Sequence, residues 1–144
     1  MKRNGFRIGK IFGIEVKINW SWLIIFGLIT WNLTSAFGQI HAEWRVITKL
    51  SVAFVAALIF FVSVLVHELA HSLVARARGV PVGGITLFLF GGVSDIQSHP
   101  PSPLTEFLIA VVGPLTSFIL GTGFILASGI EITSLELSLS NPRE

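Results

Sequence analysis

The sequence predicts an α-helical integral membrane protein, with about three transmembrane helices and a short membrane-associated β-hairpin or sheet between the second and the third. Of its 144 residues, 52% are hydrophobic and only 12% are charged, whereas a soluble domain carries about 25% charged residues. Three apolar stretches each reach the length of about 20 residues that a helix needs to cross a membrane. We expect residues 1–144 to form a single membrane domain, because this length leaves no room for a second sizeable soluble one.

Residues 1–17 precede the first apolar stretch and carry five basic side chains and one acid. Apolar and polar residues alternate in this segment, which predicts a strand or an interfacial segment. A cleaved signal peptide is the alternative interpretation. The apolar run that follows is longer than the roughly 7–15 residues of a signal-peptide core, and this favours a first membrane span.

The three spans are expected at about residues 18–37, 50–74 and 104–130. Trp20, Trp22 and Trp31 lie near the ends of the first span, where aromatic residues gather at membrane interfaces. Arg76 and Arg78 follow the second span directly. Basic residues at such a place indicate the end of a helix at the water interface.

Residues 82–93 lie between the second and third spans and are rich in glycine and β-forming residues. The segment is too short to span as a helix, so it predicts one or two strands. Non-helical backbone at membrane depth is tolerated only where protein or a water-filled cavity covers it. We therefore expect this segment to pack against the helices.

The distribution of basic residues predicts the orientation in the membrane. One side would hold Lys2, Arg3, Arg7, Lys10, Lys17, Arg76 and Arg78, and the other side Arg45, Lys49 and Arg143. This excess places the N-terminus in the cytoplasm. The second span would then end at the cytoplasmic face.

The pattern H-E-x-x-H occupies residues 67–71, in the last third of the second span. On a helix, His67 and His71 share one face and can both bind one zinc ion. Glu68 can act as the general base for a zinc-bound water. A polar trio that only forms hydrogen bonds between helices is the alternative, although burying such groups in a membrane is costly.

A zinc hydrolase needs a third protein ligand, and the sequence does not single one out. Cysteine is absent, so histidine and carboxylates are the available types. Asp95 and Glu106 are the two acids expected near the cytoplasmic end of the second span, although Glu106 also suits a helix start. His41 lies in a polar link and is read as solvated, whereas His99, in the proline-rich turn, could reach solvent or the mouth of the site. The net charge of +2, without a basic stripe, argues against nucleic-acid binding.

Two further features of the sequence can be interpreted either as part of the functional site or as simple packing. A strand edge near Ile85, Leu87 and Leu89 could hold an extended substrate by strand addition, or these residues could simply pack under the helices. Gly113 and Ser117 belong to a small-residue stripe, which we read as helix packing. Such small-residue faces could also pack against a second copy of the chain in a homo-oligomer.

Taken together, these residues resemble the site-2 proteases, which are intramembrane zinc metalloproteases. The resemblance rests on F-x-x-V-x-x-H-E-x-x-H at residues 61–71, Phe-Gly-Gly-Val at 90–93, Glu-Phe at 106–107 and Gly-Pro-Leu at 113–115. It is strongest for the prokaryotic branch that carries a pair of cystathionine-β-synthase-type domains. The resemblance implies a prokaryotic cytoplasmic-membrane enzyme, with a lipid bilayer around it and a membrane-tethered protein as its substrate, acting in regulated intramembrane proteolysis.

The resemblance also implies six or so transmembrane helices, with a third zinc ligand from an Asn-Pro…Asp-Gly-type motif on a later helix. The sequence contains no such motif. We therefore expect a truncated site-2 protease core, in which His67, His71 and Glu68 carry over. The alternatives are a catalytically incomplete module that binds membrane helices, or a different zinc peptidase that uses Glu106 as its third ligand.

Overall fold

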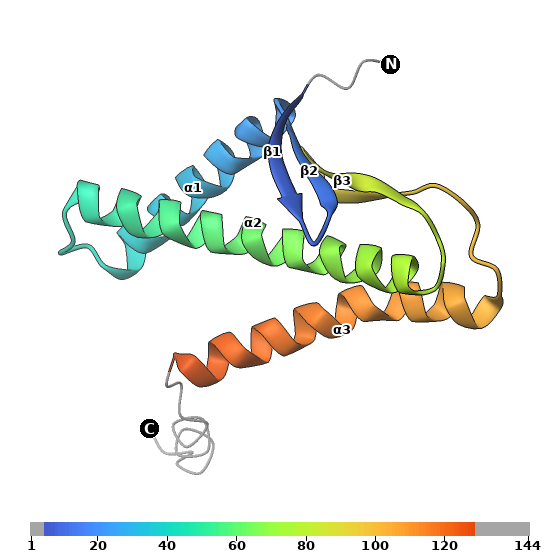
Figure 1. The fold of residues 1–144 in the computed structure, drawn as a ribbon. Helices are drawn as coiled ribbons and strands as arrows, with labels where there is room; N and C mark the ends of the chain where they lie inside the picture. The colour runs from blue at the N-terminus through green and yellow to red at the C-terminus, as the bar shows by residue number, and fades with distance from the viewer. Residues whose placement is uncertain (1–4, 129–144) are drawn as a thin grey trace, which may run out of the picture.

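The computed structural model describes residues 5–128 as three helices and one four-stranded sheet (Figure 1). The elements in chain order are β1 (Gly5–Ile11), β2 (Ile14–Asn19), α1 (Ser21–Ile40), α2 (Val46–Ala77), β3 (Val82–Phe88), β4 (Gly91–Ile96) and α3 (Pro103–Ala127).

All three helices are long and apolar enough to cross a membrane, which confirms the expected fold class. The boundaries within residues 5–128 differ from the expected ones by one to four residues, and the expected end of the third span at residue 130 lies outside the described residues. α1 begins later than residue 18, because residues 14–19 continue the N-terminal segment as a strand, and the Asn19 side chain then accepts a hydrogen bond from the Ser21 N–H at 2.9 Å. α2 has 32 residues and is therefore about 48 Å long, at 1.5 Å per residue. It exceeds the hydrocarbon thickness of about 30 Å.

The N-terminal segment and the glycine-rich segment form one sheet, in the order β1-β2-β3-β4. β1 pairs antiparallel with β2, and β3 pairs antiparallel with β4. β2 and β3 pair in parallel, with Val16 opposite Ile85 and Ile18 opposite Leu87. The expected segment 82–93 is thus a hairpin that continues to residue 96, and the sheet includes a second hairpin that the sequence did not predict.

The inner face of the sheet packs on the C-terminal half of α2. Ile14, Leu69 and Ile85 form a buried cluster between them, with Leu65 and Leu73 packed against it. Every second residue of β2 is buried, as expected for a strand with one covered face. This packing therefore holds the sheet in a fixed position against α2, the helix that carries the H-E-x-x-H pattern.

α3 lies against α2 on the side away from the sheet (Figure 1). Its start is well defined, because Ser102 accepts a hydrogen bond from the Thr105 N–H at 3.2 Å and Pro103 follows at the first helical position. Ile109 of α3 is buried with Ala75 and Val80. The C-terminal half of α2 is thus held between the sheet and α3.

Candidate metal centre and cavity

The structure brings the two histidines of α2 together. The Nε2 atoms of His67 and His71 lie 3.1 Å apart. Two nitrogen ligands at the zinc distance of about 2.0–2.1 Å in tetrahedral geometry lie about 3.3 Å from each other. The two imidazoles therefore fit two positions around one ion.

The other ring nitrogen of each histidine contacts α3. His67 Nδ1 lies 2.8 Å from Ser117 Oγ, and His71 Nδ1 contacts the backbone carbonyl of Ile109. A carbonyl oxygen can only accept, so the His71 Nδ1 carries the proton and its Nε2 is left with a lone pair when the ring is neutral. Partners of this kind orient metal-binding histidines in proteins.

Gly113 allows α3 to approach the two histidine rings. A Cβ atom at this position would lie 2.7 Å from His67 Nε2 and closer still to the His71 ring. Real Cβ atoms do not approach other atoms so closely, so any side chain here would displace a histidine or α3. Glycine is therefore required for this arrangement of the two helices.

Glu68 points towards the sheet and is held from that side. Ser94 of β4 donates from Oγ to Glu68 Oε2 at 2.8 Å, and Ser72 of α2 donates to Ser94 Oγ at 3.1 Å. A Cβ atom at Gly92 would lie 2.6 Å from Glu68 Cγ. The histidines are thus oriented by α3, and the carboxylate beside them by β4.

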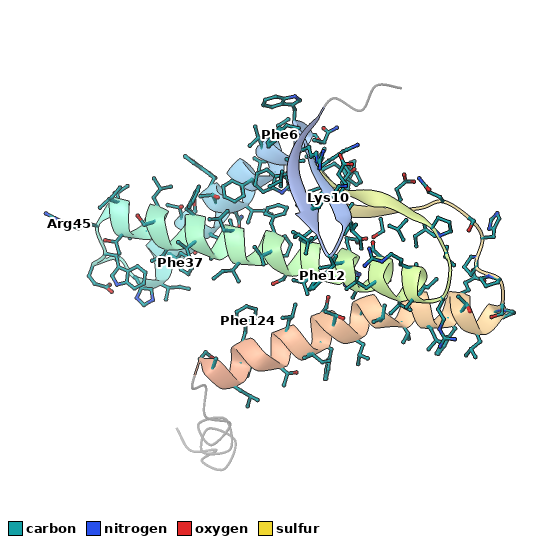
Figure 2. All side chains as sticks on the ribbon, in the orientation of Figure 1. Phe6, Lys10, Phe12, Phe37, Arg45 and Phe124 are labelled. Atoms are coloured by element: carbon teal, nitrogen blue, oxygen red, sulfur yellow. The ribbon has the colours of Figure 1, made fainter. Side chains whose placement is uncertain are left out.

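A cavity of about 630 Å³ opens onto His67, Glu68 and Ser117. Its walls come from α1, α2, α3 and the β3–β4 turn, and they are mostly apolar. They comprise Ile25, Ile29, Phe60, Phe61, Ser63, Val64, Leu89, Phe90, Gly91, Leu120, Gly121 and Phe124. Figure 2 shows Phe124 on the side of α3 that faces α2. The shape and polarity are those of a site for an apolar ligand with a few polar groups at one end.

The two acids considered as third ligand do not join the histidines. Within residues 5–128, no three histidine, cysteine, aspartate or glutamate side chains come together as a group able to hold a metal ion. Asp95 and Glu106 are both exposed. His41 stacks on Trp44, with ring centroids 4.1 Å apart, in the link between α1 and α2. The fit to zinc therefore rests on two histidines and an adjacent carboxylate.

The hypothesis of an accessible edge near residues 85–89 is wrong for this strand. Ile85 and Leu87 are 1% and 4% exposed and belong to the core. Both edges of β3 are occupied, by β2 and by β4, so no third strand can pair with it. Leu89 differs, because it lies in the cavity wall.

Several residues at the site were not singled out by the sequence. Ser94 and Ser72 carry no motif of their own, and their contacts depend on how β4 packs on α2. Gly113 and Ser117 were noticed as a stripe of small residues but read as packing. Their spacing of four residues was the available signal, since it places both on one face of α3.

Paired histidines with an adjacent carboxylate, in a helix long enough to span a membrane, form a candidate metal site in a membrane protein. The chain belongs to Peptidase family M50, whose sequence pattern matches residues 55–135. This result confirms the resemblance to site-2 proteases.

Proteins similar to this chain are named as zinc metalloproteases or as a site-2 protease. A Synechocystis sp. protein named as a zinc metalloprotease, sll0528, is 39% identical over 126 residues, which cover 85% of this chain and 32% of the relative. The protein of Mycobacterium tuberculosis named as zinc metalloprotease Rip3 is 33% identical over 142 residues, covering 96% of the chain and 36% of the relative. The solved structure of the site-2 protease from Methanocaldococcus jannaschii matches with a TM-score of 0.61 and 31% identity, over 86% of this chain and 51% of that one.

The chain thus spans about a third of the length of these curated relatives, 32% and 36%. The names of the relatives imply zinc. The branch with cystathionine-β-synthase-type domains stays a prediction, because nothing in these similarities tests it.

Proposed function

We propose that this chain is the zinc-binding N-terminal part of an intramembrane metalloprotease, which hydrolyses a peptide bond of a membrane-tethered protein near the cytoplasmic face. The observation that carries the proposal is the pair of Nε2 atoms 3.1 Å apart, beside a carboxylate and at one end of an apolar cavity. His67 and His71 would hold the ion. Zinc bound there would supply a Lewis acid that makes water a nucleophile at neutral pH.

Glu68 has the position and the chemistry of a general base. Its carboxylate would accept the proton of the attacking water and deliver it to the nitrogen of the leaving amine. The hydrogen bond from Ser94 occupies Oε2, and Oε1 would accept the proton. The apolar walls of the cavity suit a segment of a membrane protein as the substrate.

The proposed location near the cytoplasmic face has two supports. β2 precedes α1 and β3 follows α2, and the two strands pair. The two helices between them must therefore return the chain to the side on which it started. The excess of basic residues on that side predicts that it is cytoplasmic.

A complete site needs one more ligand. In the family pattern, this ligand is an aspartate on a later helix. The complete site would draw it from sequence beyond residues 5–128 or from a second copy of the chain. A homo-oligomer is proposed only as one route to this ligand. The exposure of Glu106 argues against the peptidase type that would use it.

A second candidate function follows from the same observation about ligands. Because no group of three potential ligands exists within the described residues, 5–128, the chain as it stands could be a module that binds membrane helices without catalysis. Its cavity of about 630 Å³ would then receive a helix and no zinc.

The zinc content of the purified chain in detergent separates the two functions. At saturating zinc, we expect about one zinc per chain in the wild type and in Glu68→Gln, and none in His67→Ala, because an imidazole lone pair is required and the base is not a ligand. His41→Ala, which removes an imidazole outside the site, is the matched control and should retain zinc. If the wild type holds no more zinc than His67→Ala, the metalloprotease proposal fails for this chain.

A further inference from the structure

We propose that Ser117 is a positioning residue for His67. The Ser117 hydroxyl accepts a hydrogen bond from the His67 Nδ1–H and thereby keeps the His67 Nε2 available to the metal. This inference rests on the proposed function, because it assigns a role towards the ion that His67 would bind. It gives a specific task to a residue that the sequence suggested only as part of a packing stripe.

The partner of the Ser117 hydroxyl is unusual for a membrane-spanning helix. Serine and threonine in a helix commonly donate to the carbonyl four residues back. Ser63 donates to the Ile59 carbonyl at 2.9 Å, and Thr116 donates to the Val112 carbonyl at 2.7 Å. Ser117 instead reaches across to α2, where its Oγ lies 2.8 Å from His67 Nδ1.

The neighbouring residues make this contact specific. Gly113, one turn before Ser117, leaves the space that both histidine rings occupy. A residue four positions further along the same face of α3 then lies beside the outer nitrogen of His67. The two small residues thus act together, the first by providing room and the second by providing a polar partner.

The hydrogen bond matters because the two imidazoles have a competing arrangement. At 3.1 Å, a proton on His67 Nε2 could be donated to His71 Nε2, which has a lone pair because its Nδ1–H is bonded to the Ile109 carbonyl. That arrangement would occupy both nitrogens that a metal needs. A hydroxyl can accept from the Nδ1–H or donate to a bare Nδ1. Once Nε2 binds the metal, the proton must lie on Nδ1, and the Ser117 oxygen at 2.8 Å then accepts it.

Removing the hydroxyl should therefore weaken metal binding without removing a ligand. In the full chain in detergent, zinc titration against a competing chelator should show about 10- to 100-fold weaker binding for Ser117→Ala, the usual effect of losing such a partner. Ser117→Thr keeps the hydroxyl at an exposed position and should bind zinc within a few-fold of the wild type. Thr116→Ala removes the neighbouring hydroxyl of α3, which donates to the Val112 carbonyl, and should have no effect.

A second measurement reports on the hydrogen bond itself. In the zinc-loaded chain with ¹⁵N-labelled histidine, the His67 Nδ1–H should exchange slowly with water in the wild type and rapidly in Ser117→Ala. The His71 Nδ1–H, bonded to the Ile109 carbonyl, should be unchanged and serves as the internal reference. A purely structural role of Ser117 would not separate the two protons.

The outcomes distinguish this inference from the proposed function. If the wild type binds zinc and Ser117→Ala binds it equally tightly, or if the His67 proton exchanges at the same rate in both, the role of Ser117 is overturned while the zinc site stands. If the wild type binds no more zinc than His67→Ala, both are overturned.

Discussion

At the scale of single residues, Ser94 and Ser72 connect the sheet to the carboxylate of Glu68. Ser72 is fully buried, and its hydroxyl donates to Ser94 Oγ. Ser94 in turn donates to Glu68 Oε2. A buried hydroxyl that loses its partner costs about 1–3 kcal/mol, whereas removing both partners of a pair can be nearly neutral.

We expect Ser94→Ala to lower the free energy of unfolding by about 1–3 kcal/mol, because it leaves the Ser72 hydroxyl without its acceptor. The double variant Ser72→Ala with Ser94→Ala should be no less stable than Ser94→Ala alone. Denaturant unfolding of the four proteins in detergent gives the double-mutant cycle. Simple additivity of the two effects would show that the two hydroxyls are not coupled.

The residue scale also separates what the sequence could and could not predict about the site. The approach of His67 to His71 follows from a spacing of four on a helix, so it was predictable from local geometry. The partners Ser117, Ser94 and Ile109 are between 26 and 50 residues away along the chain. No local pattern encodes such contacts, because they depend on how α3 and β4 pack on α2.

At the scale of elements, the close approach of α3 to α2 determines the space available to the two histidine rings. Gly113 is buried, and the two histidine rings fill the space where a side chain would lie. The same helix has glycines with open space around them, such as Gly121 and Gly123. Glycine is thus structurally required at one of these positions and tolerated at the others.

Gly113→Ala should reduce the zinc content of the purified chain to that of His67→Ala. The added methyl group would overlap the rings, so either the rings or the helix must move. Gly121→Ala is the matched control, since it adds the same methyl group to the same helix at a position with no atom within 4 Å. Equal zinc content in Gly113→Ala and Gly121→Ala would show that the contact with α3 is dispensable.

Element boundaries show where sequence patterns are ambiguous. The alternation in residues 14–19 continues without a break into the apolar run of α1, so the first span was expected too early. The turn between the two strands falls at residues 89–90, and the glycines at 91 and 92 begin β4, which continues through Ser94 to Ile96. A strand that lies on a helix with one face and is exposed on the other gives a weaker hydropathy signal than a span.

At the scale of the whole molecule, two observations constrain the topology together. The pairing of β2 with β3 requires α1 and α2 to act as a helical hairpin, and Figure 2 places Arg45 at the end of α2 remote from the sheet. The two loops at residues 41–45 and 97–102 should therefore lie on opposite sides of the membrane. The sequence predicted the three spans, but it did not predict that the N-terminal strands join the later ones.

The orientation can be tested directly, because the chain contains no cysteine. Ala42→Cys and Ser98→Cys each introduce a single exposed thiol, in the link before α2 and in the turn before α3. With the N-terminus in the cytoplasm, a membrane-impermeant maleimide added to intact cells should label the first and spare the second. The opposite labelling pattern would reverse the orientation and place the candidate metal centre near the outer face.

The parallel pairing of β2 with β3 also has a consequence for how the chain acquires its structure during synthesis. Residues 16–18 pair with residues 85–87, so the N-terminal hairpin leaves the ribosome well before its neighbour exists. At about 5–20 residues per second, the 66 intervening residues take about 3–13 s to synthesise. Throughout that interval β2 exposes an unpaired edge, while both helices must enter the bilayer. Membrane insertion thus precedes completion of the sheet, and a delay in insertion would prolong the exposure of an aggregation-prone strand.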